Sequence, residues 1–348
     1  SHELDSIGAS YNAFTGKDYT GYYVKVASAH LELAMDIISD MLWHSKFAQE
    51  EIDKERHVIM EEINMYYDNP IMHVEELFEE RMFGKNHPLG WLISGPKSTI
   101  GTISRAEITS YFRRHYFPNN MVLCVSGKFN EARTFKQIQA MFGNVNHKRP
   151  PTRAKSYKHA QSRPQLILAQ RDTEQVQLGL GYPGLPYNHK DLPALSLLGV
   201  ILGGNMSSRL FTRVREQEGL AYSIHASRSS YQDTGTFFIQ AGLDKKRVLP
   251  ALELILHELN AVREHGVTAE ELLHAKEFIK GKLVLDLEDS ESIANFLTSQ
   301  EVLTGSIQTV EERIKKLQRV TVHDVQRVAQ MLFRKDRLNL ALIGPESN

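Results

Sequence analysis

The sequence has a single cysteine, Cys124, no long apolar run and almost no net charge. One cysteine excludes an internal disulfide and is typical of a protein in a reducing compartment. The longest apolar stretch, 192–202, contains Pro193 and Gly199 and is too short to span a bilayer. The 41 lysines and arginines nearly cancel the 42 aspartates and glutamates, so the charge predicts no nucleic-acid partner and no binding to an acidic membrane.

The composition that remains is that of an ordinary globular protein. Hydrophobic residues make up 41% of the 348 residues and charged residues 24%, which excludes a disordered or collagen-like chain. Because domains commonly contain about 100–200 residues, this length predicts two domains.

A basic segment, 143–163, has the composition of a linker. It holds two adjacent prolines, six lysines or arginines and no acidic residue, and it lacks apolar periodicity. A nucleic-acid-binding segment would also be basic, but a solvated linker is the preferred interpretation. The predicted organisation is a first domain at 1–146, a linker at 147–163 and a second domain at 164–348.

Both predicted domains mix helices and strands. In the first, the pattern predicts strands at 9–15, 19–27 and 121–126, and helices at 30–46, 48–68, 71–83, 104–115 and 130–142. In the second, it predicts strands at 165–170, 176–183, 221–229, 234–242 and 337–343, and helices at 191–203, 246–264, 268–286 and 309–332.

The two domains follow the same order of elements. Residues 18–24 (Asp-Tyr-Thr-Gly-Tyr-Tyr-Val) resemble 233–239 (Asp-Thr-Gly-Thr-Phe-Phe-Ile), and the helix start at 50–52 aligns with 270–272. The expected fold is therefore α+β, with two homologous units that each pack helices on a mainly antiparallel sheet.

The first unit of the repeat has fewer residues at its N-terminal end than the second. The second copy has two strands and a helix before the strand at 221–229, whereas eight residues precede the strand at 9–15. We therefore expect about 50–65 further residues, including a helix, ahead of Ser1 in the complete protein.

The helix at 48–67 carries two acids beside its apolar stripe. Glu55 and Glu62 are seven residues apart and border the stripe, whereas Glu61 points to the opposite side. A carboxylate next to a core face needs a partner, because its burial is costly. The second copy has Ala275 and Lys282 at the aligned positions, so the fold itself does not require acids there. The stripe consists of Ile52, Ile59, Ile63 and Tyr66.

Two other arrangements have simpler explanations. His57 and Glu61 are four residues apart and could ligate a metal, but they face away from the apolar stripe, and a solvent-facing pair is the preferred interpretation. Cys124 lies in an apolar strand pattern, where a lone cysteine is usually a small core residue.

Several motifs together resemble one family. They are Ala9 to Thr15 (Ala-Ser-Tyr-Asn-Ala-Phe-Thr), Asp18-x-Thr20-x-Tyr22-Tyr23, Glu55-Arg56-x-Val58-Ile59-x-Glu61-Glu62-Ile63, His115-Tyr116-x-Pro118, Met206 to Phe211, and Arg215-Glu216-x-x-Gly219-Leu220-Ala221-Tyr222. In order and spacing they resemble the insulinase/pitrilysin family of zinc metallopeptidases across essentially the whole chain. The likeness extends to its short bacterial members and to the β subunit of mitochondrial processing peptidase.

The resemblance implies a role for particular residues. The family binds Zn²⁺ through an inverted H-x-x-E-H motif and a distant glutamate, which corresponds to Glu62, with Glu55 as a supporting acid. Arg215 and Tyr222 correspond to a pair that holds the substrate carbonyl and stabilises the oxyanion.

A substrate-binding strand is also implied. Asn12, Ala13, Phe14 and Thr15 correspond to an exposed strand edge that pairs with the peptide backbone.

The sequence departs from the family at its metal motif. It contains no H-x-x-E-H, and its fifteen histidines are never closer than eight residues, so no two can hold a metal from adjacent turns of a helix. We expect the motif in the helix that precedes Ser1 in the complete protein.

The expected function is that of a zinc-dependent endopeptidase, which hydrolyses peptides, presequences or extended protein segments by metal-activated water. The alternative is a catalytically inactive subunit of the same family that binds peptides or acts as a scaffold. A homodimer or heterodimer is expected, in the bacterial cytoplasm or alternatively the mitochondrial matrix.

Overall fold

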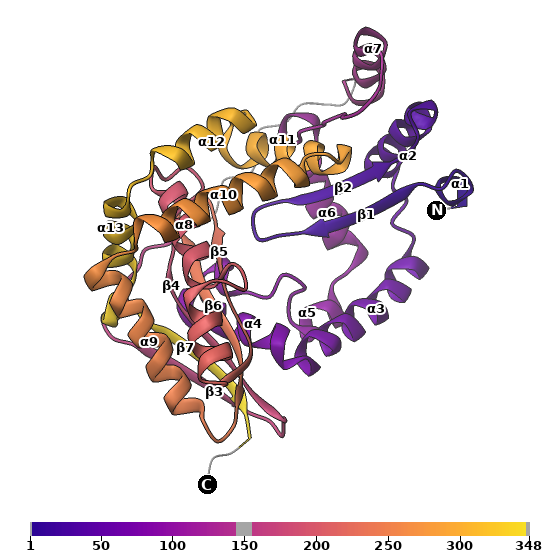
Figure 1. Cartoon of the computed structure of the whole chain (residues 1–348). Helices are drawn as coiled ribbons and strands as arrows, with labels where there is room; N and C mark the ends of the chain where they lie inside the picture. Colours follow the sequence, from indigo (N-terminus) through magenta and orange to yellow (C-terminus); the bar gives the residue numbers. More distant parts are fainter. Residues whose placement is uncertain (1, 144–154, 346–348) are drawn as a thin grey trace. The chain divides into compact units, whose positions relative to one another are not determined.

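The computed structural model describes residues 2–143 and 155–345, which form two compact units (Figure 1). Unit 1 comprises Ser1–Ile63, Ile93–Ala154 and Leu285–Ile307, and unit 2 comprises Asn64–Leu92, Lys155–Val284 and Gln308–Asn348. The strands are β1 (Ser10–Thr15), β2 (Thr20–Lys25), β3 (Gln165–Gln170), β4 (Gln175–Pro183), β5 (Ala221–Ser230), β6 (Gly235–Asp244) and β7 (Asn339–Gly344).

The α-helices are α1 (His2–Ser6), α2 (Leu31–Trp43), α3 (Gln49–Asp68), α4 (Pro70–Phe83), α5 (Lys97–Thr102), α6 (Arg105–His115), α7 (Glu131–Phe142), α8 (Leu192–Gly203), α9 (Val248–His265), α10 (Ala269–Asp286), α11 (Ser290–Thr304), α12 (Val310–Arg319) and α13 (Val322–Leu332). Short 3-10 turns lie at Ser28–His30, Pro88–Gly90, Pro118–Asn120 and Lys335–Arg337, and η4 (Phe211–Gln217) is a π-helix. The α+β prediction is confirmed.

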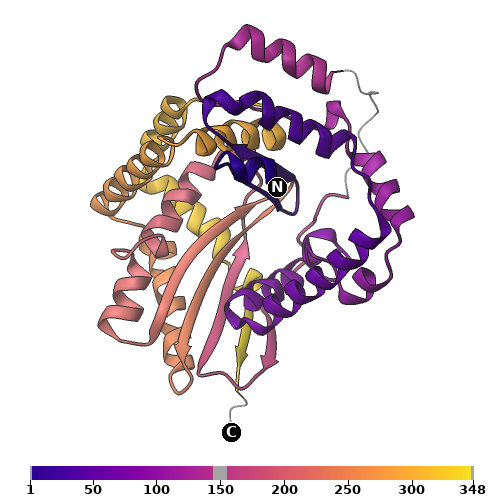
Figure 2. The same ribbon diagram turned by 90° about the vertical axis from the view of Figure 1, so that its right-hand side faces the viewer.

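Unit 2 is organised around a sheet with the strand order β3-β7-β4-β6-β5. β3 runs parallel to β7, and the other neighbours are antiparallel, so the sheet is mainly antiparallel as expected. Alternate residues of β4 and β6, such as Leu180 and Ile239, lie on the face that packs against α8, α9 and α13. Figure 2 shows the twist of these strands.

Helix α4 covers the opposite face of that sheet at close range. A Cβ atom added to Gly179 would lie 3.3 Å from Val74, and one added to Gly181 would lie 2.6 Å from Phe78. Two glycines in a strand interior therefore make room for the helix. Because Val74 and Phe78 are fully buried there, residues 64–92 group with unit 2 rather than with the first predicted domain.

In unit 1, the hairpin of β1 and β2 is the sheet that the described residues form. Helix α2 packs on β2 and on α7 (Figure 2). The rings of Trp43 on α2 and Phe142 on α7 lie 6.2 Å apart. Lys25 at the end of β2 pairs with Asp289, which also caps the first turn of α11. This ion pair lies in unit 1, so residues 285–307 group there and not with the second predicted domain.

The two hairpins agree with the predicted repeat. Four residues join β1 to β2 and four join β5 to β6, and both loops close with a backbone bond of 2.8 Å, from Gly16 to Tyr19 and from Tyr231 to Thr234. The offset between the loops is the one that aligns residues 18–24 with 233–239. The two hairpin loops thus share their length and their closing backbone hydrogen bond.

The predicted strand at 121–126 is wrong, because these residues form no ladder. In unit 2, the segment at the equivalent position of the repeat is β7, which follows α13 and pairs with β3 and β4. The described part of unit 1 places no strand in the corresponding positions, and an extended segment without a neighbour lacks partners for its backbone groups.

The predicted helix at 309–332 is two helices. Thr321 accepts a hydrogen bond from the Asp324 backbone, and Asp324 accepts one from the Thr321 backbone in return. This capping box begins a separate helix, α13, after α12 has ended at Arg319. The sequence patterns did not predict α1, α5, α11 or η4.

Part of the predicted linker is packed and not solvated. Residues 144–154 lie outside the described residues, but Tyr157 donates a hydrogen bond of 2.6 Å to the Met82 carbonyl, and its ring contacts Phe83. The His159 imidazole lies 3.0 Å from the Thr234 hydroxyl. Aromatic rings thus fix the residues before β3 to unit 2.

We expect Gly181→Ala to destabilise the protein by about 1–3 kcal/mol, because its Cβ would lie 2.6 Å from the Phe78 ring on α4 and 2.4 Å from the Phe237 carbonyl oxygen. Gly281→Ala is the matched control. Its Cβ meets nothing within 4 Å inside α10, so it should stabilise the protein by about 0.5–1 kcal/mol. Urea unfolding measures both, and equal effects would contradict the close packing of α4.

His159 should make stability fall in mild acid. Burial and the nearby Arg337 charge lower the pKa of His159 to about 4, below its ordinary 6.5. The unfolded chain therefore takes up a proton first, and stability is full above pH 6.5 and decreases as the pH falls towards 4.

Between pH 7.5 and pH 5, we expect the loss in free energy of unfolding to be about 1 kcal/mol smaller in His159→Asn than in the original protein. Thermal unfolding at the two pH values measures this difference. Ser156→Ala changes an exposed side chain that does not ionise and is the control, so it should leave the pH dependence unchanged.

Candidate functional site

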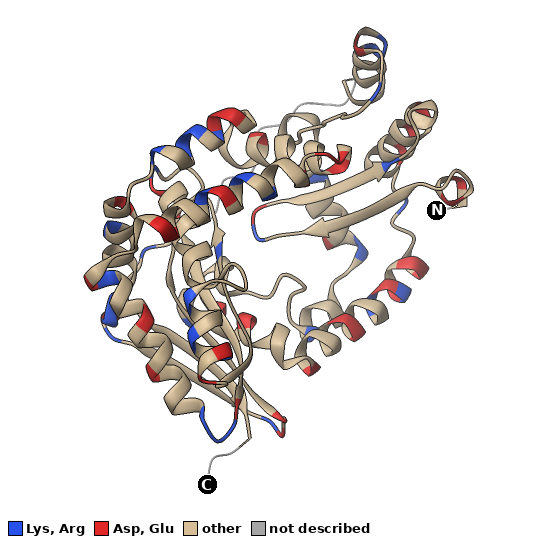
Figure 3. Ribbon diagram, in the orientation of Figure 1, with Lys and Arg blue, Asp and Glu red and all other residues tan. Residues whose placement is uncertain are grey.

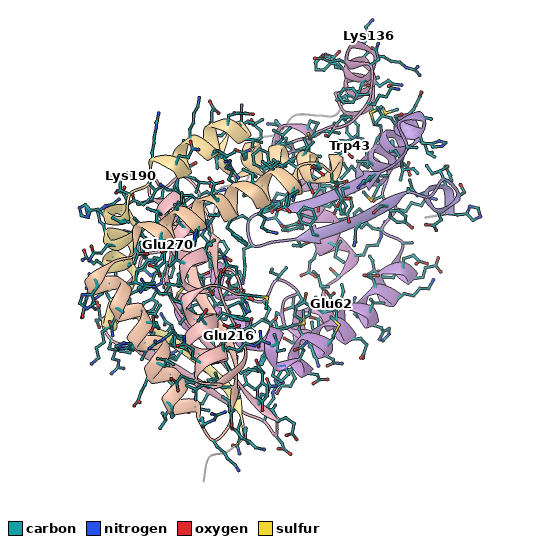
Figure 4. The ribbon with its side chains drawn as sticks, viewed as in Figure 1. Trp43, Glu62, Lys136, Lys190, Glu216 and Glu270 are labelled. Carbon is teal, nitrogen blue, oxygen red and sulfur yellow. The ribbon has the colours of Figure 1, made fainter. Side chains whose placement is uncertain are left out.

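Glu55 and Glu62 lie on α3, and both side chains are exposed. The expectation that they border a packed core face is wrong for the described residues, because Ile63 is the one buried side chain on α3. Ile52, Ile59 and Tyr66 are only half-buried. Figure 3 shows acidic and basic residues along α3, and Figure 4 labels Glu62. The two carboxylates are thus open to a ligand.

Arg56 fixes the face of α3 that carries these acids. Its side chain is 17% exposed, and its guanidinium donates hydrogen bonds to the carbonyls of Ile100 and Ile103 at the end of α5, the latter at 2.9 Å. Successive helical residues are about 100° apart, so this contact holds Glu55 and Glu62 about 100–120° around the helix from α5. Arg56 lies inside the motif, but its contact with α5 was not predicted from the sequence.

Strand β1 presents an open edge. All six of its residues are exposed, and β2 is its sheet neighbour in the described chain. Gly16 and Tyr19 form a hydrogen-bonded pair. Because such pairs alternate along an antiparallel ladder, the N–H groups of Ala13 and Thr15 point away from β2. The predicted edge Asn12–Thr15 therefore has backbone donors directed outward.

The two faces of this hairpin differ. Asn12, Phe14 and Tyr23 share one face, and the Phe14 ring covers Gly21, where an added Cβ would lie 2.2 Å from it. The opposite face carries Tyr22. Side chains that could contact a paired peptide thus come from both strands.

Behind Tyr22 lies a cavity of about 210 Å³ with aromatic walls. The Tyr22 and Tyr116 hydroxyls are 3.0 Å apart, and burial together with this contact raises the pKa of Tyr116 above its usual range. Phe47 contributes another wall and has a φ of 48°, which is uncommon outside glycine. Its carbonyl accepts a hydrogen bond of 2.6 Å from Arg105. This cavity was not predicted from the sequence.

Arg215 and Tyr222 lie in unit 2 on either side of Gly219. Arg215 is an exposed residue of η4, and its guanidinium lies 4.5 Å from the ring centre of Phe211. The register of β5 shifts between Ala221 and Ser223, so Tyr222 is the extra residue of a β-bulge, and it is 62% exposed. Bulges redirect side chains, and π-helices are frequent at functional sites. Figure 4 labels Glu216, the neighbour of Arg215.

The described residues do not fit a zinc site by themselves. Among 2–143 and 155–345, no group of three or more histidine, cysteine, aspartate or glutamate side chains could hold a metal ion. Zn²⁺ needs three or four protein ligands, and Glu62 offers one carboxylate. His57 is exposed, and Cys124 is half-buried and without a disulfide.

The described helices also include none that is long and apolar enough to cross a membrane.

Two family models match the chain. The model described as Insulinase (Peptidase family M16) matches residues 1–97, and the one described as Peptidase M16 inactive domain matches residues 102–279. The chain is also 36% identical over 345 residues to the Uncharacterized zinc protease YmxG of Bacillus subtilis, with 99% of this chain and 83% of that protein covered. The chain belongs to the M16 peptidase family.

Two solved structures share the fold. The crystal structure of a protease from Helicobacter pylori has a TM-score of 0.93 and 24% identity, and covers 99% of this chain and 83% of its own. The structure of a peptidase M16 inactive domain from Pseudomonas fluorescens has a TM-score of 0.90 and 19% identity, with the same coverage. At these identities the likeness concerns the fold alone.

The Arg56 contact should contribute to stability. We expect Arg56→Gln to lower the free energy of unfolding by about 1–3 kcal/mol, because two carbonyls lose a charged donor. Lys54→Gln removes only an exposed pair with Glu51 and should change it by less than about 0.5 kcal/mol. Urea unfolding measures both, and equal losses would show that Arg56 does not anchor α3.

Proposed function

We propose that the chain forms part of a zinc-dependent M16 endopeptidase that acts on peptides or extended protein segments. The observation that carries this proposal is the open edge of β1. Its outward N–H groups at Ala13 and Thr15 can pair with the carbonyls of an extended chain. Membership of the M16 family and the zinc-protease name of the relative support the same class.

The open edge of β1 favours substrates whose backbone carbonyls are not already hydrogen-bonded within a helix or a sheet. A strand or helix that is already paired has no free carbonyls to offer, whereas an extended segment or a presequence has them at every second residue. Because backbone groups carry most of the pairing, side-chain selection falls to neighbours on the same face, such as Phe14 and Tyr23.

The remaining residues have proposed roles in the same reaction. Glu62 is the ligand that this chain would contribute to zinc, with Glu55 one heptad earlier as a supporting acid. Arg215 and Tyr222 would donate hydrogen bonds to the substrate carbonyl, a role that needs exposed donors. The exposure of all four side chains supports these assignments.

A catalytically inactive, peptide-binding or scaffolding subunit is the second candidate. The observation that favours it is the lack of a three-ligand group among the described residues. The match of residues 102–279 to a model described as an inactive domain fits both candidates, because residues 1–97 of the same chain match the Insulinase (Peptidase family M16) model. A dimeric assembly and a location in the bacterial cytoplasm stay predictions.

Zinc analysis of the complete gene product separates the two candidates. We expect about one zinc ion per chain in that product and far less in the 348-residue chain alone. Glu62→Gln in the complete product should weaken zinc binding about tenfold or more, because a neutral amide replaces an anionic ligand. Glu61→Gln, one residue earlier on α3, is the matched control and should change little.

Equal zinc loss in the two variants would contradict the assignment of Glu62. A complete product without zinc that still binds extended peptides would support the inactive subunit. If it bound neither zinc nor peptide, the endopeptidase and the peptide-binding subunit would both be wrong, and the scaffolding subunit would be the candidate that agrees.

A further inference from the structure

One of the outward donors of β1 is already occupied by a side chain of the same strand. The Asn12 Oδ1 atom accepts a hydrogen bond of 2.8 Å from the Ala13 backbone N–H. The ladder to β2 cannot use that N–H, because Ala13 and Tyr22 form a non-hydrogen-bonded pair. The bond is therefore a local cap on the free edge.

A cap of this kind has a clear physical role. An edge strand with unpaired N–H groups invites pairing with other chains, and natural proteins protect such edges. β1 contains no proline, no charged residue and no bulge that would do so. Asparagine can protect it locally, since its short amide reaches neighbouring backbone groups.

We propose that Asn12 is a gate on the β1 edge, which closes the Ala13 N–H in the free protein and releases it when an extended peptide pairs with the strand. The proposal rests on the proposed function, because it assumes that a peptide adds to this edge. On release, the Ala13 N–H exchanges Asn12 Oδ1 for a peptide carbonyl, and no covalent bond changes.

The gate affects affinity through competition. Each binding event must break one neutral hydrogen bond at Ala13 before another forms there. Such a bond contributes about 0.5–1.5 kcal/mol net, which corresponds to a two- to tenfold change in the dissociation constant. No such side-chain bond is described for the Thr15 N–H. The competition between Asn12 and the peptide therefore occurs only at Ala13.

Hydrogen exchange tests the cap in the free protein. We expect the Ala13 amide to exchange at least several-fold faster in Asn12→Ala than in the original protein. Ser10→Ala changes another exposed β1 side chain with no described side-chain bond and is the matched control. An unchanged Ala13 exchange rate in Asn12→Ala would overturn the proposal.

Peptide binding tests the gate. The probe is a fluorescein-labelled Lys-Thr-Val-Thr-Val-Thr-Lys peptide, with an analogue N-methylated at alternate residues as the non-pairing control. We expect Asn12→Ala to bind the probe two- to tenfold tighter. Asn12→Asp should bind it two- to tenfold more weakly, because a charged acceptor holds the Ala13 N–H more strongly.

The outcomes distinguish the gate at Asn12 from the addition of a peptide strand to β1. If Ala13 exchanges faster in Asn12→Ala but the affinity for the probe is unchanged or weaker, the gate is wrong while strand addition stands. If the probe binds no variant, or binds as well when N-methylated, strand addition at β1 fails, and the gate fails with it.

Discussion

The need of every backbone N–H and C=O group for a partner is the constraint on which this structure depends. In unit 2, β4, β6 and β7 each have a strand on both sides, and their residues are largely buried. In unit 1, the described residues pair β1 with β2 and leave an outer edge on each. Asn12 meets part of that need at β1, and Arg56 meets it at the end of α5.

The two units use the same local devices in different surroundings. Both hairpins close with a four-residue loop, and both α6 and α13 begin with a capping box, at Ser104 and at Thr321. Ala275 on α10 is buried, whereas Glu55 at the aligned position on α3 is exposed. The aligned helices thus differ in burial at this position, and Glu55 is exposed where Ala275 is packed.

Within the M16 family, the chain supplies a strand edge, two exposed carboxylates, an arginine and a tyrosine. None of these is a metal site, and the described residues provide no group of three ligands. The feature that they share is accessibility, which a stability argument alone would not select. This agrees with the proposed binding of extended peptides.

The sequence by itself determined the α+β class, the repeated order of elements and the family, because these depend on local periodicity, turn residues and motif spacing. Tertiary structure decided the rest. Phe78 belongs to unit 2 because it packs over Gly181, a contact far apart in sequence. Residues 121–126 form no strand because a ladder needs a neighbour, and Tyr222 is redirected by a bulge that only the pairing of β5 with β6 reveals. Glu62 is exposed because burial depends on what packs against a helix, which its own stripe does not specify.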